Sequence, residues 1–281
     1  MQMDKEQEKK LHDAMIALFL LMLKYSNKIN PLLGLFKSNR DTVKAAINKI
    51  YATYTKDNQL IMSSKQINAE IKKLEPMLKK IGNDLMVKEK DLLSSLLPMI
   101  YGETYYRTYY ELSKGMSLDV KKLIDSIIGK SINQKIEGKT AFDRNKDNKI
   151  KFISKANRDM KDQLKKGVSI EKINKTIDKN FNTGVSFSHR LIGNEIIRNF
   201  GNAQREVFNT AIILTVLFSA VLDERTTPLC ESLDGNVYPL GEAPEPPLHI
   251  WCRSMLLPII TNWNDKQNNE SWDTFKERND I

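Results

Sequence analysis

Apolar residues recur at helical spacing through the first 180 or so residues of this 281-residue chain. One such stripe consists of Ile67, Ile71, Leu74, Leu78 and Ile81. Steps of three and four residues place these side chains on one face of a helix, and that face must be buried against other helices or a partner subunit. The N-terminal two-thirds of the chain are therefore predicted to be mainly helical.

The same periodicity predicts where the helices lie. We expect helices over residues 4–27, 38–54, 63–80, 83–97, 98–114, 169–179 and 188–210. Pro31 is expected to end the first helix, because the residue before a proline is disfavoured in the helical region, and Pro76 to kink the third. Tyr101, Tyr105 and Tyr109 recur at four-residue steps, which favours packing in a core or interface over a base-stacking platform.

The chain changes character after residue 210. Residues 215–223 (TVLFSAVLD) are β-branched and aromatic, as in a buried strand. Five of the nine prolines lie within residues 228–247, and a short strand over 236–238 is expected after the Asp234-Gly235 turn. The fold class is thus predicted to be α+β, with a small loop-rich β module at the C-terminus.

By composition, the chain divides into four consecutive regions. These are a helical region for packing or interaction (1–135), a basic helical region (136–210), the β module (211–260) and a polar tail (261–281).

Composition and apolar runs exclude several classes of protein. A hydrophobic fraction of 41% is too high for wholesale disorder, and two cysteines are too few for a disulfide scaffold but suit a reducing cytoplasm. The apolar runs 14–23 and 211–222 fall short of the roughly 20 residues that a membrane-spanning helix needs. We expect no membrane segment and no secretion signal.

Positive charge is concentrated in the middle of the chain. The 44 Lys and Arg exceed the 35 Asp and Glu by nine, and residues 121–179 alone carry 17 against 8. This window predicts non-specific contact with the phosphates of duplex DNA, although a solvated helix face has the same composition. The candidate DNA-binding residues are Lys151, Lys155, Arg158, Lys161, Lys165 and Lys166.

Motifs of nucleotide, calcium and nucleophilic-enzyme sites fail. Ile124 occupies the first glycine position of a phosphate-binding loop that would end at Gly129-Lys130-Ser131, and Asn148 replaces the glycine of a calcium loop that would begin at Asp143. No nucleophile elbow is present. The chain is not predicted to be an enzyme.

Both cysteines and one of the three histidines lie close together in the sequence, as Cys230, His249 and Cys252. Thiolate and imidazole are the ligands that zinc prefers, so the set is a candidate structural zinc site, with Asp223 as the leading fourth ligand and Glu231, Asp234 or water as others. Free buried cysteines and a disulfide remain as alternatives, as does a His249 that only hydrogen-bonds the backbone.

Two arginines flank this set. Arg225 and Arg253 are expected to make two-pronged contacts to Asp223 or Asp234 and so fix the loops.

The spacing of these residues resembles the C-terminal signature of the phage Mu F-like minor head proteins, also called phage head-morphogenesis proteins. The signature is Asp-x-Arg-Thr-(Ser/Thr)-x-x-Cys, an Asp-Gly hairpin and Pro-Pro-x-His-x-x-Cys-Arg. The matching residues are Asp223, Arg225, Thr226, Thr227, Cys230, Asp234, Gly235, Pro246, Pro247, His249, Cys252 and Arg253. A preceding helix also resembles the family, with Arg190, Glu195, Arg198 and Asn202, but has Asn194 where the family commonly has Thr.

The resemblance spans about residues 139–258 and implies a virion protein inside the phage head, near the portal vertex, assembled in the host cytoplasm. It implies several copies per virion, contact with the portal and with major capsid or scaffolding protein, non-specific contact with double-stranded DNA and no membrane in the resting state. The implied roles are head morphogenesis, DNA packaging and DNA ejection.

Two other functions are weighed against this one. Cys230, His249 and Cys252 would also serve a zinc-dependent hydrolase or nuclease if the fourth metal position were open. Alternatively, the chain would be a toxin effector carried in the virion, with residues 1–135 as its payload. No catalytic constellation in that region supports the second alternative.

Overall fold

The computed structural model describes residues 3–56, 59–264 and 270–281 and contains two compact units. The sheet unit comprises Met1–Ser26, Ser95–Gln134 and Gly193–Ile281, and the bundle unit comprises Asn27–Ser94 and Lys135–Ile192. Two long helices, α3 (Ser64–Ser113) and α6 (Ile170–Thr210), contribute residues to both units. The compact units therefore do not follow the four consecutive regions drawn from composition.

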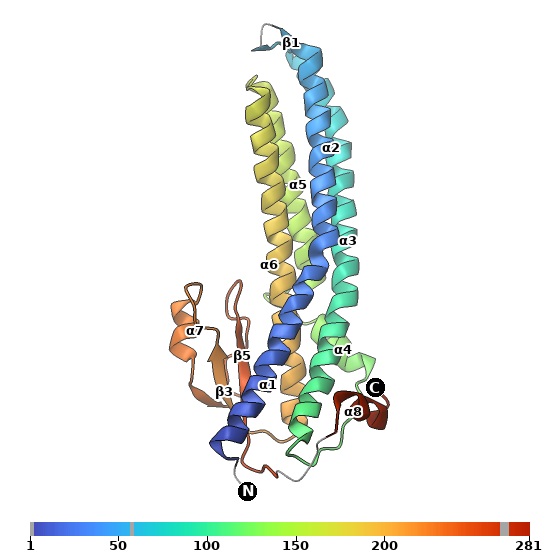
Figure 1. The fold of residues 1–281 in the computed structure, drawn as a ribbon. Helices are drawn as coiled ribbons and strands as arrows, with labels where there is room; N and C mark the ends of the chain where they lie inside the picture. The colour runs from blue at the N-terminus through green and yellow to red at the C-terminus, as the bar shows by residue number, and fades with distance from the viewer. Residues whose placement is uncertain (1–2, 57–58, 265–269) are drawn as a thin grey trace. The chain divides into compact units, whose positions relative to one another are not determined.

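In the described residues, the bundle unit is built from long helices that lie side by side (Figure 1). They are α2 (Asn30–Tyr54), the N-terminal part of α3, α5 (Ala141–Lys165) and the N-terminal part of α6. A two-stranded hairpin of β1 (Thr55–Lys56) and β2 (Gln59–Leu60) joins α2 to α3.

The core of the bundle unit contains the predicted stripe. All five residues of that stripe are buried. Three aromatic rings pack next to one another, with ring centroids 5.9 Å apart for Phe36 and Phe152 and 5.1 Å apart for Phe152 and Phe181. Gly184 leaves room for this layer, since a Cβ there would lie 2.9 Å from the Phe36 ring.

The first helix, Lys5–Lys24, is shorter than predicted, whereas several later helices are longer. α2 begins at Asn30 rather than at residue 38, because Pro31 occupies the first turn, where its missing N–H would have had no helical partner. The three helices predicted between 63 and 114 are one helix, α3. Pro76, which was expected to kink the helix, lies within α3; this residue is exposed, so water can satisfy the carbonyl that it leaves unpaired. The two helices predicted between 169 and 210 are likewise one, α6.

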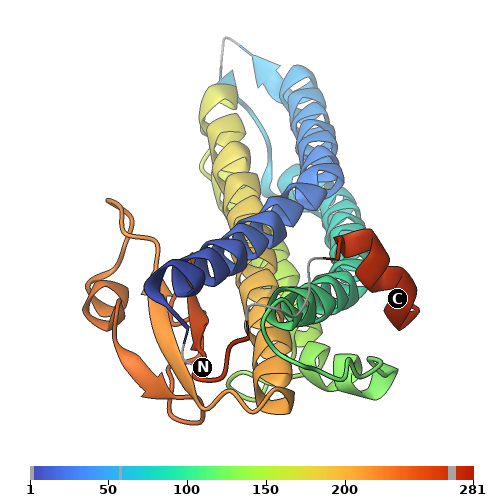
Figure 2. The ribbon, with the colours of Figure 1, turned by 60° about the horizontal axis from the view of Figure 1, so that its bottom comes forward.

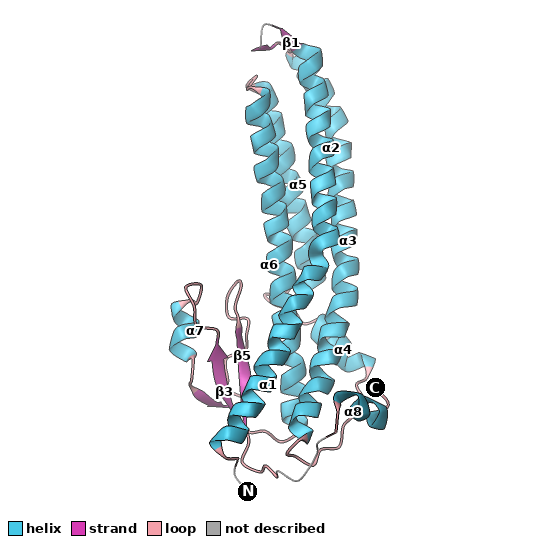
Figure 3. Ribbon diagram, viewed as in Figure 1, coloured by secondary structure: helices cyan, strands magenta, loops and turns pink. Residues whose placement is uncertain are grey.

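The sheet unit combines helices with a small antiparallel sheet, which α1 (Lys5–Lys24) and α7 (Pro228–Leu233) contact (Figures 2 and 3). Its other helices are the C-terminal part of α3, α4 (Asp125–Ile132), the C-terminal part of α6 and α8 (Trp272–Asn279). Its strands are β3 (Thr215–Ala220), β4 (Val237–Pro239) and β5 (Ser254–Ile259), in the order β4-β3-β5.

The central strand β3 pairs with β4 on one side and with β5 on the other, with Leu217 opposite both Val237 and Leu257. The predicted strands at 215–223 and 236–238 are present as β3, which ends three residues earlier than predicted, and as β4, which is shifted by one residue. Helix α1 contacts β5, and His12 Nε2 lies 3.0 Å from the carbonyl of Pro258. The chain is mainly helical with one small sheet near the C-terminus, so the predicted α+β class is confirmed.

The tyrosine face of α3 is part of the packed interior. Tyr101, Tyr105 and Tyr109 are all buried, and the Tyr105 and Tyr109 rings meet edge to face at 5.1 Å. Burial raises the pKa of the Tyr101 and Tyr105 hydroxyls. Packing, rather than base stacking, is confirmed for this face.

Among the described residues, no helix combines the length and apolar character that crossing a membrane requires.

Candidate metal centre and basic bundle

Three segments of the sheet unit bring the candidate ligands together. Cys230 lies on the short helix α7, which Thr227 caps by accepting a hydrogen bond from the Cys230 N–H at 3.4 Å. Cys252 lies just before β5, and His249 lies in the loop that precedes it. Because β3 pairs with β5, the loops at this end of the sheet meet, although 22 residues separate the two cysteines.

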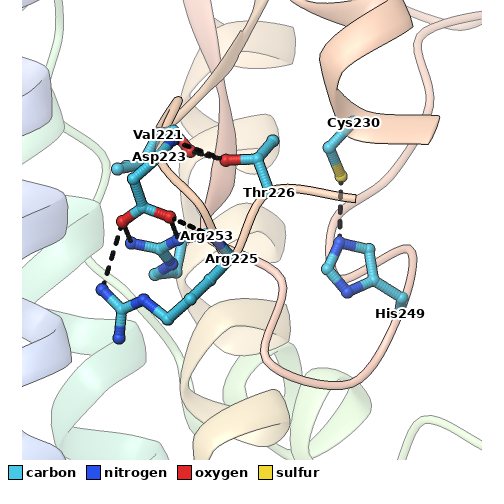
Figure 4. A network of polar contacts seen from close by, with 7 residues as sticks. All are labelled: Val221, Asp223, Arg225, Thr226, Cys230, His249 and Arg253. Atoms are coloured by element: carbon cyan, nitrogen blue, oxygen red, sulfur yellow. Dashed lines mark hydrogen bonds and ion pairs between the residues drawn. The ribbon is translucent and has the colours of Figure 1, made fainter. Parts of the chain in front are cut away.

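The structure brings Cys230, His249 and Cys252 together as a cluster that could hold a metal ion. Their ligand atoms all lie within 4.8 Å of one another. The two Sγ atoms are 3.8 Å apart, and Cys230 Sγ is 3.1 Å from His249 Nε2 (Figure 4). Two sulfurs bound to one tetrahedral zinc at about 2.3 Å would lie about 3.8 Å apart. Both cysteines are free, so the disulfide alternative is not the state of this structure.

The orientation of His249 suits metal binding. Its Nδ1 lies 2.8 Å from the carbonyl of Ile250 and can only donate to that acceptor. The proton is then on Nδ1, which leaves the lone pair of Nε2 directed at Cys230. A metal ion would replace the thiol proton between these two atoms.

Both thiols are enclosed. Burial raises the pKa of Cys230, opposed by hydrogen bonds from the Ser254 and Thr227 hydroxyls. These hydroxyls would also be the outer partners of a metal-bound thiolate, whose remaining lone pairs need donors.

Asp223 does not belong to this cluster. The nitrogens Nη1 and Nη2 of Arg253 donate to its two carboxylate oxygens at 2.7 and 2.5 Å, and Arg225 Nη2 donates to Oδ2 at 3.2 Å (Figure 4). The Arg253 side chain and the Arg225 backbone N–H hold the pKa of Asp223 well below its usual range. The predicted two-pronged contact is confirmed for Arg253 but is wrong for Arg225, whose side chain makes a single contact to Asp223. The prediction of Asp223 as the fourth ligand is also wrong, because arginines engage both of its carboxylate oxygens.

The other signature residues build the loops. Thr226 Oγ1 donates to the carbonyl of Val221 at 2.6 Å, and Asp234 Oδ1 accepts from the Ala220 N–H at 2.7 Å. Gly235 has a φ of 77°, which explains why glycine occupies the turn after Asp234. Pro247 follows Pro246 through a cis peptide bond.

Asn194 has a role that the sequence did not reveal. Its Oδ1 accepts a hydrogen bond of 3.2 Å from the Trp251 N–H, across 57 residues of sequence. The residue that departs from the family pattern therefore holds the loop between His249 and Cys252. The sequence does place a bulky tryptophan, Trp251, between His249 and Cys252, and this residue could have indicated that the loop packs against another element.

The candidate DNA-binding residues lie on α5 and at its C-terminal cap. Lys151, Arg158, Lys165 and Lys166 are exposed, while Lys155 and Lys161 are half-buried. The residues that α5 buries occupy other positions of its turns, so these six cations share the solvent side of the helix. Two acids are interspersed: Asp159 pairs with Lys155, and Asp162 lies between Arg158 and Lys165.

Charge separates between the two compact units. The bundle unit carries 28 Lys and Arg against 14 Asp and Glu, a net charge of +14. The sheet unit carries 16 against 21, a net charge of −5. Residues 135–179 of the basic window lie in the bundle unit, which also includes Asn27–Ser94, whereas residues 121–134 of the window belong to the sheet unit.

Comparison of the chain with protein-family models, curated proteins and solved structures finds no match.

Proposed function

We propose that this chain is a structural minor head protein of a tailed bacteriophage, located inside the head near the portal and acting in head morphogenesis and in packaging or ejection of DNA. One observation carries the proposal: signature residues spread over positions 223–253 converge on one end of the sheet, as the Asp223–Arg253 pair and the Cys230–His249 contact. In this role the sheet unit is a docking module for the portal and for capsid or scaffolding protein.

A structural zinc ion is part of the proposal. Two thiols and an imidazole nitrogen, with sulfurs 3.8 Å apart, match the donor set and spacing that zinc prefers. Cys230, His249 and Cys252 would hold the ion and cross-link α7 to the start of β5. A small, loop-rich module gains folding free energy from such a cross-link.

The bundle unit is proposed to face DNA. Its net charge of +14 favours contact with a polyanion, and the exposed cations on α5 follow one side of a helix. No base-reading motif accompanies them in the sequence, so the contact is proposed to be independent of DNA sequence.

The composition of purified virions tests the proposal. Particles are treated with nuclease and protease, which remove loosely attached protein, and the chain is then quantified by mass spectrometry relative to the portal protein. We expect the chain to be protected and present in several copies per particle. Absence from protected particles would refute the proposal, and so would a nuclease activity of the purified chain that is lost with a chelator, since that would favour the enzyme alternative.

A further inference from the structure

A pocket of about 640 Å³ opens beside the candidate metal centre in the sheet unit. His249 and Cys252 are part of its lining, so two of the three candidate ligands border this space. Much of the remaining lining is apolar and comes from Leu23, Ile196, Ile197, Ile250 and Trp251. An apolar pocket with a few convergent polar groups is the usual form of a ligand site.

The loop that carries Trp251 is held in an unusual conformation. Trp251 has a φ of 65°, in the left-handed region that costs free energy for a bulky residue. Two contacts support this conformation. The Trp251 N–H donates a hydrogen bond to Asn194, and the Trp251 ring packs against Gly193, where an added Cβ would lie 3.4 Å from the ring. Trp251 is nevertheless 52% exposed as a residue and lines the pocket, so the loop presents an aromatic residue there.

A metal ion at the centre would keep one position open. Among the described residues, the candidate ligands that gather are Cys230, His249 and Cys252, and Asp223 is engaged by Arg253. A tetrahedral ion with three protein ligands takes its fourth from water or from an external group. Because His249 is partly exposed and lines the pocket, an external group would reach the ion from there.

The charge balance favours an anionic group. A divalent ion with two thiolates is neutral, and so is the pair of Asp223 and Arg253. Arg225 also lines the pocket; its side chain is 70% exposed and contacts Asp223 through one N–H. Because Arg253 already balances the charge of Asp223, the positive charge of Arg225 attracts an anion to the mouth of the pocket.

The structure assigns to this pocket a ligand that carries a carboxylate on an apolar body, whose carboxylate would complete the metal coordination beside Arg225 and whose body packs against Ile250 and Trp251. This inference rests on the proposed metal site and adds a ligand to it. A free small acid and the C-terminal residue of a partner protein share this chemistry.

Cobalt-substituted protein provides the test, because the visible spectrum of Co²⁺ reports each change of its ligands. The full chain is loaded with Co²⁺ and titrated with 3-phenylpropionate, with 3-phenylpropanol as the matched alcohol. An acetylated peptide that ends in a free C-terminal phenylalanine is compared with its amide. We expect the two carboxylates, but not the alcohol or the amide, to shift the spectrum and to saturate. Tighter binding of 3-phenylpropionate would identify a free small acid as the ligand, and tighter binding of the peptide would identify the C-terminus of a partner protein.

Variants separate the parts of the pocket. Trp251→Ala should weaken binding of 3-phenylpropionate about tenfold while leaving that of acetate unchanged, since only the former contacts the ring. Arg225→Gln should weaken binding of both acids. Val237→Ala, an exposed apolar position of the same unit that does not line the pocket, should change neither.

The outcomes are distinguishable. If Co²⁺ gives no thiolate charge-transfer band, or gives the same band in Cys230→Ser, both the metal site and the ligand site are refuted. If Co²⁺ binds through Cys230 but no carboxylate changes its spectrum, the metal site stands and the ligand inference is overturned. Equal affinity of the wild type and the Trp251→Ala variant for 3-phenylpropionate would also overturn it.

Discussion

At the scale of single residues, the most specific contact is the two-pronged pair between Arg253 and Asp223. It joins the residue after Cys252 to the loop after β3, across 30 residues of sequence. A planar guanidinium presents two parallel N–H groups to a carboxylate, which an ammonium cannot do. The side chain of Arg253 is 21% exposed, so solvent screens this pair less than it screens Arg225.

Replacing Arg253 with lysine therefore tests the geometry rather than the charge. We expect Arg253→Lys to lower the melting temperature of the protein by a few degrees, because one of the two hydrogen bonds to Asp223 is removed. Arg225→Lys is the matched control, since Arg225 makes one longer side-chain contact to the same carboxylate and should melt like the wild type. Differential scanning calorimetry measures both, and equal melting temperatures of the two variants would contradict the role given to Arg253.

At the scale of helices, close packing in the bundle unit depends on where glycine is placed. A Cβ at Gly184 on α6 would lie 2.9 Å from the Phe36 ring and 3.1 Å from the Phe152 ring. Gly34 on α2 has no atom within 4 Å of such a Cβ. Both glycines lie in helices, where alanine is intrinsically favoured by about 1 kcal/mol.

The two glycines should respond to alanine in opposite directions. Gly34→Ala is expected to raise the free energy of unfolding by about 0.5–1 kcal/mol, the gain in helix propensity. Gly184→Ala is expected to lower it by about 1–3 kcal/mol, because the added methyl forces the aromatic layer apart. Urea unfolding followed by circular dichroism measures both changes, and stabilisation by Gly184→Ala would show that the layer is not packed as described.

A buried ion pair links α5 to α3 within the bundle unit. The Nζ of Lys149 is 2.5 Å from Glu89 Oε2 and 3.0 Å from the Ser188 hydroxyl, and the two charged side chains are only 3% and 0% exposed. Burial lowers the pKa of Lys149, while Glu89 acts in the opposite direction. Lys149 thus belongs to the core, although it lies within the basic window of the sequence.

Removal of one charge should be far more costly than removal of both. Lys149→Met leaves Glu89 buried without a partner and is expected to lower the free energy of unfolding by about 3–5 kcal/mol. Combining it with Glu89→Leu should restore most of that stability, since an apolar pair of similar volume avoids the desolvation cost. The same urea titration applies; a double variant no more stable than Lys149→Met would contradict this explanation.

Helices and strands were predictable where the signal is local. The stripe from Ile67 to Ile81 and the β-branched run of β3 have their own periodicity and composition, so each was located correctly. The lengths of α3 and α6 were not, because Gly82 stands at one predicted break in α3 and Gly184 at the break predicted in α6. Each glycine disfavours a helix locally, but its lack of a side chain lets Ile153 or Phe36 pack closely. Local signals cannot register either compensation.

The candidate site divides in the same way. Cys230, His249 and Cys252 were identified because few cysteines and histidines are present and they lie close in sequence. The contact of Asn194 with Trp251 was not identified, because the two residues are 57 positions apart and no sequence motif relates them. The ion pair of Lys149 and Glu89, 60 residues apart, was missed for the same reason.

At the scale of the whole molecule, the chain carries two bodies of opposite charge, +14 in the bundle unit and −5 in the sheet unit. A net charge of +9 for the chain conceals this separation. Opposite charges suit different partners: the bundle unit a polyanion, and the sheet unit a protein surface.

Affinity for duplex DNA should accordingly fall with salt and depend on the bundle unit. A variant in which the cations at four positions of α5 are replaced by Gln is expected to bind duplex DNA more weakly. The slope of log K, the binding constant for DNA, against log [salt] should fall by up to about 3–4, because each phosphate that is no longer neutralised removes about 0.9 from it. These positions are Lys151, Lys155, Arg158 and Lys165. A second Gln variant removes four exposed cations of the sheet unit and should bind like the wild type; its positions are Lys5, Lys9, Lys10 and Lys24. Fluorescence anisotropy with duplexes of two unrelated sequences measures the slopes. Equal slopes for the two variants, or an affinity that ignores salt, would contradict a DNA contact through α5.

The position of the chain in the virion tests the proposed role most directly. Electron cryomicroscopy of DNA-filled heads, reconstructed without imposing capsid symmetry, would locate it, with a gold or antibody label on the C-terminus to identify the density. We predict density for this chain inside the head at the portal vertex, with the bundle unit against packaged DNA. A chain found on the outer surface of the capsid, in the tail or in no part of the particle would contradict the proposal.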